Sequence, residues 1–442
     1  MVYYYVKLHK KSFKDFIEES LNIPLTSLHK WVIKGGWAIL DQGLFSGANF
    51  LVNILLARWL PPKEYGAFAV ALSVYYLLLN FHTAVLTEPM MVFGAGKYRE
   101  HFRKYLGLLL WGHWGVSALI SLALGGAALV AAHAGSRPLA RALAGLAIAA
   151  PFLLLFWLTR RACYVEMCPI WALSGSALNA VLVLAGLVYI AHIHRLSSFS
   201  GLLLLGGVGL VSALQIGAWL RPQLQRTMGK PALSVVVGDH FRYGRWATGT
   251  VLLMWVPGNI AYTLLPVWAG LQGSAQVRAV MNFVLPVQQG LAAISLLILP
   301  HFSSLYTQHN LRLFRKRILM FIALFLSIAF AYGSILFGGK DHLIAFFYKG
   351  RYPEVASLLP LALLLPFVAG MNAVVGAALR AMERPDRVFF SYIFTSLVAL
   401  TVGVALMMLW GVKGALWSMV LSTLTTSVAM TYFLAKEFRE GA

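Results

Sequence analysis

Long apolar runs, separated by short charged or Pro/Gly-rich breaks, occupy almost the whole sequence. A helix of about 20 apolar residues crosses a hydrocarbon core of roughly 30 Å. The pattern therefore predicts an all-α, polytopic membrane protein with about twelve transmembrane helices. The expected spans lie near Gly36–Ala57, Ala67–Gly94, Tyr105–Ala132, Leu139–Leu158, Ile170–Ala191, Phe199–Leu220, Trp246–Ala269, Val280–Leu299, Ile318–Phe337, Leu358–Met382, Val388–Trp410 and Ala415–Ala435.

The Lys and Arg residues fall unevenly on the two sides of these spans. Cytoplasmic loops retain an excess of Lys and Arg during membrane insertion. Of the 36 basic residues, 26 fall on the side that holds both termini, and ten fall in connections on the other side. The sequence therefore predicts that the N- and C-termini are both cytoplasmic.

The second half of the chain repeats features of the first at an offset of 209 residues, which relates Trp37 to Trp246 and Trp59 to Trp268. Six spans in each half would give both halves the same orientation. We therefore expect two six-helix lobes related by a pseudo-two-fold axis along the membrane normal. The expected parts are a cytoplasmic tail (1–35), a first lobe (36–220), a cytoplasmic connector (221–245), a second lobe (246–435) and a short cytoplasmic tail (436–442). Within the first tail, Lys10–Leu21 fits either a helix lying on the inner leaflet or a frayed segment.

Composition narrows the functional class. The chain is 60% hydrophobic and 12% charged, whereas soluble domains carry about 25% charged residues. The net charge of +21 follows from loop Lys and Arg rather than from one polar face, so it does not indicate nucleic-acid binding. Cys163 and Cys168 lack companion ligands at metal spacing and are interpreted as packing thiols. No phosphate-binding loop, nucleophile triad or metal-ligand set is found, so we expect no enzymatic activity, cofactor or metal.

Two carboxylates lie inside predicted spans. Asp41 is on the first span and Glu88 is on the second, both nearer the cytoplasmic side. Ionisable groups at membrane depth usually face a water-filled cavity or a partner. Two readings remain open: Asp41 and Glu88 bind a coupling proton or sodium ion, or each pairs with a nearby Lys or Arg.

Polar residues also recur at helical spacing within the spans. Such stripes either line a cavity or form hydrogen bonds between packed helices. The cavity candidates are Gln42, Ser46, Asn49 and Asn53 on the first span, Asn80 and His82 on the second, and Asn259, Asn282, Gln288 and Gln289 in the second half.

Four short motifs carry a resemblance to a known group of proteins. Lys34–Gly43 reads KGGWAILDQG and Leu55–Gly66 reads LLARWLPPKEYG, with RRACY at Arg160–Tyr164 and LRAMERP at Leu379–Pro385. The set resembles bacterial polysaccharide-biosynthesis and O-antigen flippase-like membrane proteins of the multidrug/oligosaccharidyl-lipid/polysaccharide (MOP) exporter superfamily. The resemblance covers about residues 34–438.

The resemblance implies two six-helix lobes around a central cavity, alternating access, and movement of undecaprenyl-pyrophosphate-linked sugars across the inner membrane. It leaves the pyrophosphate-binding residues open, because few Lys or Arg lie at clear midmembrane depth. Arg58, Arg278 and Arg380, at expected helix ends, are the candidates.

The expected function is therefore a flippase for a lipid-linked oligosaccharide, the precursor of a lipopolysaccharide O-antigen or another polysaccharide. The expected partners are membrane lipids and polysaccharide polymerase or export machinery. One alternative is an ion-coupled multidrug antiporter of the same superfamily, which resembles this chain in having an acidic residue on its first helix. A membrane assembly factor without transport activity is a third reading.

The predicted topology can be tested with reporter fusions. Reporters placed after Lys104, after Gly229 and at the C-terminus should report a cytoplasmic location, because the basic residues concentrate on that side. Reporters near Pro62 and Lys349 should report the periplasm. A periplasmic C-terminus would show that the count of twelve spans is wrong.

Overall fold

The computed structural model describes residues 25–224, 233–308 and 310–440, and the predicted Lys10–Leu21 helix lies outside them. Within the described chain the secondary structure is helical. The first lobe contains α3 (Leu25–Trp59), α4 (Pro62–His82), a π-helical turn η1 (Thr83–Thr87), α5 (Glu88–Ala95), a 3₁₀ turn η2 (Arg99–His101), α6 (Phe102–His133), α7 (Arg137–Val165), α8 (Pro169–His192) and α9 (Ser198–Leu220).

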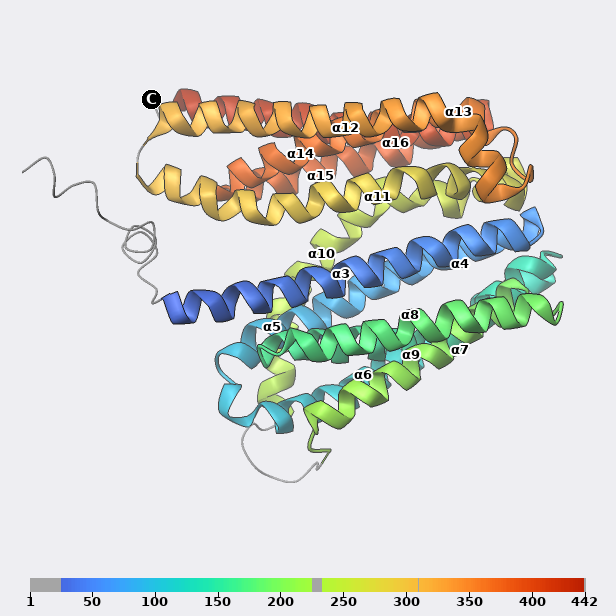
Figure 1. Ribbon diagram of the computed structural model, residues 1–442, viewed down its shortest axis with the longest axis horizontal. Helices are drawn as coiled ribbons and strands as arrows, with labels where there is room; N and C mark the ends of the chain where they lie inside the picture. Colours follow the sequence, from blue (N-terminus) through green and yellow to red (C-terminus); the bar gives the residue numbers. More distant parts are fainter. Residues whose placement is uncertain (1–24, 225–232, 309, 441–442) are drawn as a thin grey trace, which may run out of the picture.

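The second lobe follows the same plan of long helices joined by short turns (Figure 1). Its elements are α10 (Leu233–Leu264), α11 (Pro266–Thr307), α12 (Leu311–Tyr348), α13 (Val355–Ala362), α14 (Leu364–Ala381), α15 (Pro385–Val398), η3 (Ala399–Gly403) and α16 (Val404–Glu440).

Nine helices of the described chain are long and apolar enough to cross a membrane, and α10 with α11 forms a further pair that is bent by 104°. Two of these units are helical hairpins. The 56-residue run Pro385–Glu440 breaks at Gly411 (φ 54°, ψ −123°), and a Cβ on Gly414 would lie 1.9 Å from the carbonyl oxygen of Leu406. Across the bend between α10 and α11, Ser274 donates to the carbonyl of Tyr262 (3.0 Å). With each hairpin supplying two spans, the arrangement is the predicted two-lobed, twelve-helix fold.

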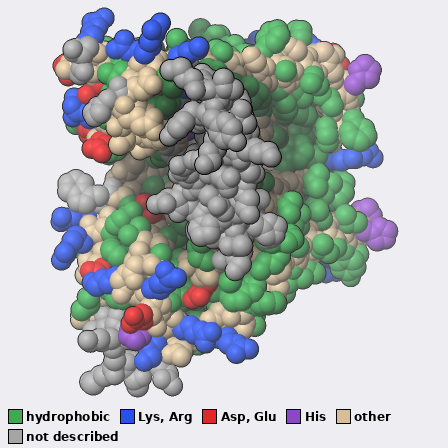
Figure 2. Space-filling model, turned by 60° about the vertical axis from the view of Figure 1, so that its left-hand side comes forward, with side chains coloured by type: hydrophobic (Ala, Val, Ile, Leu, Met, Phe, Trp, Pro, Cys, Tyr) green, Lys and Arg blue, Asp and Glu red, His purple; other side chains and the backbone are tan. Residues whose placement is uncertain are grey.

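The two ends of the molecule differ. The end that carries Leu25, Glu440 and the start of α10 is here named the terminal end, and the opposite end is named the far end (Figure 1). The lobes converge at the far end and diverge toward the terminal end. Figure 2 brings the terminal end forward and shows Lys and Arg side chains around it, with a hollow between the lobes beside the atoms drawn in grey.

The burial pattern agrees with this arrangement. One cluster of buried hydrophobic residues joins both lobes at the far end, whereas each lobe has a separate cluster in its terminal half. Along α3, Ile39 and Leu40 are 74% and 56% exposed, but Leu56 and Ala57 are fully buried. The half of α3 nearer the far end is therefore buried between the lobes, and the half nearer the terminal end borders the open space between them.

The helix α10 connects the lobes. Residues 233–245, which fall within the expected connector, form its first turns. These turns pack on the first lobe near η1 and α5, and later turns pack on α15 and α16. The main-chain carbonyl of Leu253, for example, accepts a hydrogen bond from Ser396 of α15 (2.8 Å).

One expected boundary is wrong in a way that matters for function. The eighth span was expected to begin at Val280, which would leave Arg278 in the preceding connection at a helix end. The segment α11 instead begins at Pro266 and breaks at Gly270 (φ 64°, ψ 177°), so Arg278 lies inside the helix that follows the break and is only 5% exposed. The polar stretch between Gly270 and Arg278 looks like a loop in sequence, but it packs against α4.

A close approach of the two lobes depends on a glycine. A Cβ on Gly66 of α4 would lie 1.8 Å from the carbonyl oxygen of Leu271 of α11, which is backbone and cannot rotate away. Any side chain at this position must therefore push α11 away from α4.

We expect Gly66→Ala to weaken the contact between the lobes. Overpacking of this kind costs about 1–3 kcal/mol, so the thermal unfolding midpoint of the purified protein should fall. Gly115→Ala on α6 is the matched control, because its Cβ would meet nothing within 4 Å and alanine favours a helix by about 1 kcal/mol. Equal midpoints for Gly66→Ala and the wild type would contradict the close approach.

Candidate functional site

The polar stripe predicted on the first span follows α3 along the space between the lobes. Gln42 and Asn49 are exposed, Ser46 is half-buried, and Asn53 is only 6% exposed. Gln42 donates to the hydroxyl of Ser46 (3.2 Å). The stripe thus begins in the open half of the molecule and ends, at Asn53, where the lobes meet.

Asn53 meets Arg278 of the other lobe. The Nε of Arg278 donates to Oδ1 of Asn53 (3.0 Å). The guanidinium also lies 6.0 Å from the ring centre of Tyr76 and 5.9 Å from that of Tyr262, within the range of cation–π attraction. Arg278 therefore contacts α3, α4 and α10 where the space between the lobes ends and the lobes meet.

Arg278 has no counter-charge. Within the described residues no carboxylate pairs with it; its neighbours are an amide and phenol rings. A charged side chain at the centre of a membrane helix costs about 2.5–3.5 kcal/mol on insertion scales. The amide and the rings offset only part of that cost, so the site keeps an excess of positive charge.

A second polar stripe on α11 starts at the same arginine. Asn282, one turn further along, donates to the hydroxyls of Tyr65 (3.0 Å) and Tyr348 (3.2 Å). Gln289 lies at i+7 from Asn282, hence on the same helical face, and is exposed, while Gln288 beside it is half-buried. The stripes of α3 and α11 meet at Arg278 and both run from there toward the terminal end.

Further hydrogen bonds close the far end. Arg351 donates to the carbonyl of Leu60 at the end of α3 (2.6 Å). The hydroxyl of Ser73 donates to the carbonyl of Asn259, and Trp255 donates to the carbonyl of Ser73 (3.1 and 3.0 Å). Asn259 thus joins the lobes through its main chain, while its side chain donates to Trp255 of its own helix (3.3 Å).

Asp41 is the centre of a buried network in the first lobe. Arg160 of α7 donates to it through Nε (3.0 Å to each oxygen) and Nη2 (2.8 Å), and both side chains are at most 1% exposed. The hydroxyls of Tyr164 and Ser176 also donate to the carboxylate. Arg160 reaches Gln42 as well (3.2 Å). In this conformation a coupling ion would have to displace Arg160, so binding of an ion by Asp41 stays a prediction.

Arg160 is the partner that the sequence reading missed. The expected fourth span ends at Leu158 and leaves Arg160 outside it, but α7 continues to Val165 and buries this side chain. Its guanidinium lies 4.2 Å from the ring centre of Phe45. The presence of Asp41 itself indicates a basic partner, because a carboxylate within a transmembrane span usually pairs with a cation from a neighbouring helix.

Glu88 lies apart from the Asp41 network and faces α10. It accepts a hydrogen bond from the hydroxyl of Tyr243 (2.8 Å). Nearby, Lys97 forms an ion pair with Asp239 (2.6 Å), and this hydrogen bond raises the pKa of Lys97. These contacts join the start of α10 to the first lobe.

His240 strengthens the same junction. Its Nδ1 donates to the carbonyl of Val85 (2.8 Å), and its Nε2 accepts from the hydroxyl of Tyr105 (2.7 Å). Burial lowers the pKa of His240, which favours the neutral imidazole whose Nε2 accepts from Tyr105.

The remaining candidates are dispersed. His82 is fully buried in the first lobe, and its Nε2 lies 3.0 Å from Nδ1 of His113. It therefore does not border the space between the lobes. Asn80 is half-buried on α4, and Arg58 is half-buried in the last turn of α3. Arg380 is exposed in the last turn of α14.

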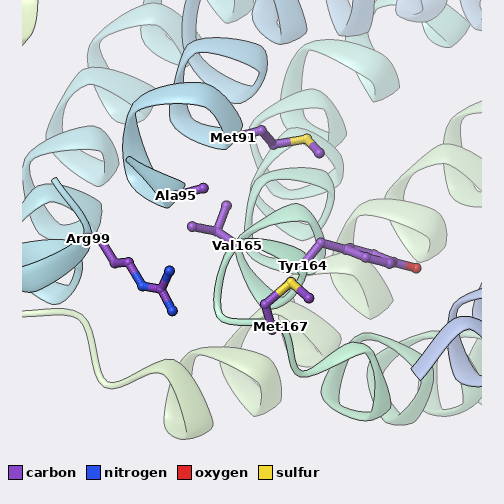
Figure 3. A pocket seen from close by; sticks show the side chains of 6 residues that line it. All are labelled: Met91, Ala95, Arg99, Tyr164, Val165 and Met167. Carbon is purple, nitrogen blue, oxygen red and sulfur yellow. The ribbon is translucent and has the colours of Figure 1, made fainter. Parts of the chain in front are cut away.

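A small cavity of about 150 Å³ lies beside the Asp41 network, between α5, η2 and α7 (Figure 3). It is lined by Met91, Ala95, Arg99, Tyr164, Val165 and Met167. Tyr164 extends away from Arg99 in Figure 3, in keeping with its hydrogen bond to Asp41 on α3. Within the described residues no cluster of three or more His, Cys, Asp or Glu could hold a metal ion.

Known structures match the fold over nearly the whole chain. A multidrug resistance MATE family transporter of the MOP superfamily, in an inward-facing conformation, gives a TM-score of 0.73 at 12% identity and covers 92% of this chain and 100% of its own. The lipid II flippase MurJ, in an inward closed conformation, gives 0.70 at 12% identity and covers 91% and 87%. No protein-family model and no curated protein sequence matches the chain. The chain shares the fold of these transporters.

A third known structure shares the fold with a lower score. An outward-facing MATE family transporter of the MOP superfamily gives a TM-score of only 0.61 at 13% identity, covering 91% of this chain and 94% of its own.

We expect Asp41→Asn to destabilise the first lobe. Loss of the carboxylate leaves Arg160 buried without a counter-charge, which costs about 3–5 kcal/mol. The thermal unfolding midpoint and membrane abundance should both fall, and the double variant Asp41→Asn/Arg160→Met should recover part of the loss. Glu88→Gln, at a half-buried site, should have a smaller effect. Normal stability of Asp41→Asn with loss of export would instead support the ion-coupling reading.

Proposed function

We propose that this protein is a transporter rather than an enzyme, and that it moves a lipid-linked oligosaccharide across the bacterial inner membrane by alternating access. The observation that carries the proposal is Arg278, a buried guanidinium between the lobes with no carboxylate partner within the described residues. Burial of this unpaired cation lowers the stability of the protein. We therefore expect it to bind an anion that is not part of the chain.

A pyrophosphate group fits this requirement. Arginine presents several N–H donors in a planar fork that matches phosphate oxygens. The amide of Asn53, which accepts a hydrogen bond of 3.0 Å from Arg278, is neutral. A phosphate oxygen would form a stronger, charge-assisted bond and would replace that amide.

The remainder of the site fits a sugar. Gln42, Ser46 and Asn49 on α3, together with Gln289 on α11, present amides and a hydroxyl along the space between the lobes. Amide groups both donate and accept hydrogen bonds, as sugar hydroxyls require. The glycan would therefore lie along the two stripes with its pyrophosphate at Arg278.

Occupation of Arg278 would also couple binding to the conformational change. The bond from Arg278 to Asn53 joins the two lobes at their contact, next to the bond from Asn282 to Tyr65. A phosphate that takes Arg278 away from Asn53 removes one of the bonds holding the far end closed. Binding energy would thus favour opening at the far end, which alternating access requires.

The multidrug antiporter is the second candidate, favoured by the MATE-like fold and by Asp41 on the first long helix. An antiporter for lipophilic cations needs an acidic or aromatic site. This site instead contains Arg278, whose positive charge repels such substrates. Asp41, the only carboxylate of α3, is already paired with Arg160.

The proposal includes a location and partners. The start of α3 and the end of α16 lie at one end of the molecule (Figure 1), and we assign that end to the cytoplasm because most Lys and Arg belong to it. The sugar-lipid would then enter from the cytoplasmic leaflet and leave toward the polymerase or export machinery. A proton or sodium gradient is the proposed energy source.

The proposal predicts a defined phenotype. Deletion of the gene should block surface polysaccharide and accumulate its lipid-linked precursor on the cytoplasmic leaflet, without changing sensitivity to cationic dyes. Arg278→Gln should fail to restore export, although its thermal stability should equal or exceed that of the wild type, because an uncompensated buried charge is removed. Arg278→Lys should restore it in part.

Arg137→Gln is the charge-matched control, since Arg137 is exposed at the same far end and has no described partner; it should restore export fully. Normal polysaccharide together with dye hypersensitivity in the deletion strain would refute the flippase and favour the antiporter.

A further inference from the structure

A second basic site lies at the terminal end of the first lobe, apart from the space between the lobes. A cavity of about 380 Å³ is lined there by Arg103, Trp171, Ala218, Trp219 and Arg221. This volume lies within the range of ligand-binding pockets. The lining residues come from the start of α6, the start of α8 and the end of α9.

The chain beyond α9 is fixed against α6, which builds one wall of the cavity. The N–H of Gln223 donates to the carbonyl of Arg103 (2.9 Å), and the indole of Trp111 donates to the carbonyl of Leu224 (3.2 Å). Gly107 permits this approach, because a Cβ there would lie 1.8 Å from the carbonyl oxygen of Gln223. Arg103 and Arg221 are therefore brought to one cavity by ordered backbone.

The cavity has positive charge and aromatic walls. Arg103 and Arg221 are exposed and have no carboxylate partner within the described residues. The rings of Trp171 and Trp219 pack with their centres 5.4 Å apart. Tryptophan favours the level of lipid head groups, and two arginines beside one cavity favour a phosphate.

An apolar surface continues from the cavity along α9 toward the far end. Leu214 and Val211 follow Ala218 at spacings of four and three residues, hence on one face of the helix. They are 62% and 47% exposed. This continuity distinguishes a lipid, which has acyl chains to cover such a face, from a free phosphate ion, which does not.

From these observations we propose that the cavity binds the head group of an anionic phospholipid from the leaflet at the terminal end. Arg103 and Arg221 would bind the phosphate, Trp171 and Trp219 would contact the glycerol region, and the acyl chains would lie on Val211 and Leu214. The helices α6, α8 and α9 pack mainly on α7, on α3 and on one another, so this lipid site is separate from Arg278 and independent of the transported substrate.

Two substitutions remove the charge without endangering the fold. Arg221 ends α9 in a left-handed conformation (φ 48°, ψ 57°) that glycine adopts more easily, so Arg221→Gly should fold at least as well. Arg103→Gln keeps a long polar side chain at an exposed position. The control Arg312→Gln/Lys316→Gln removes two exposed charges from the first turns of α12, at the same end of the other lobe.

The test is native mass spectrometry of the delipidated full chain, titrated with phosphatidylglycerol or with phosphatidylcholine of the same acyl chains. The wild type and the control should bind phosphatidylglycerol about tenfold more tightly than phosphatidylcholine. Arg103→Gln/Arg221→Gly should lose that preference, and excess inorganic phosphate should not displace the lipid.

Any of three results would overturn the lipid site. The first is an unchanged preference in Arg103→Gln/Arg221→Gly. The second is an equal loss in the control, which would indicate a general effect of surface charge. The third is displacement by inorganic phosphate, which would indicate a site for free anions.

Discussion

A positive charge held between two lobes without a negative partner is the constraint on which this structure depends. Arg278 contacts α3, α4 and α10 through one amide and two phenol rings, and the lobes meet around it. An ion pair at this point would hold the lobes together by itself. The guanidinium instead contacts an amide and phenol rings, which are neutral, and under the proposed function an anionic ligand takes the place of the Asn53 amide.

The other ion pairs and hydrogen bonds determine which helices are held to the first lobe. The Asp41–Arg160 pair, with Tyr164 and Ser176, fixes α3 to α7 and α8, so α3 moves with the first lobe. At the terminal end, Glu88 and the ion pair of Lys97 with Asp239 hold the start of α10 on that lobe as well. The free boundary between the lobes therefore runs along α3 and α11, where the two polar stripes lie.

The sequence was sufficient for the architecture but not for the centre of the site. Hydropathy alone places the spans, because each must bury its backbone in lipid as a helix. It misplaced the start of α11, since the polar stretch before Arg278 looks like a loop until its packing against α4 is known. It left open whether Asp41 pairs with a basic residue and did not identify Arg160 as the partner, because the two residues are 119 positions apart in sequence. Tertiary packing decided both cases. The stripe on α3 was visible in the sequence because its spacing follows the helix itself.

Equilibrium binding of an isoprenoid-pyrophosphate-linked sugar to the purified protein tests the role of Arg278 most directly. If Arg278 holds the pyrophosphate, Arg278→Gln should bind this ligand at least about tenfold more weakly, a loss of about 1.4 kcal/mol. Arg137→Gln should bind it as the wild type does, and an isoprenoid alcohol without phosphate should not distinguish the three proteins. Equal affinity of the wild type and Arg278→Gln for the pyrophosphate ligand would contradict the assignment of Arg278 as the head-group site.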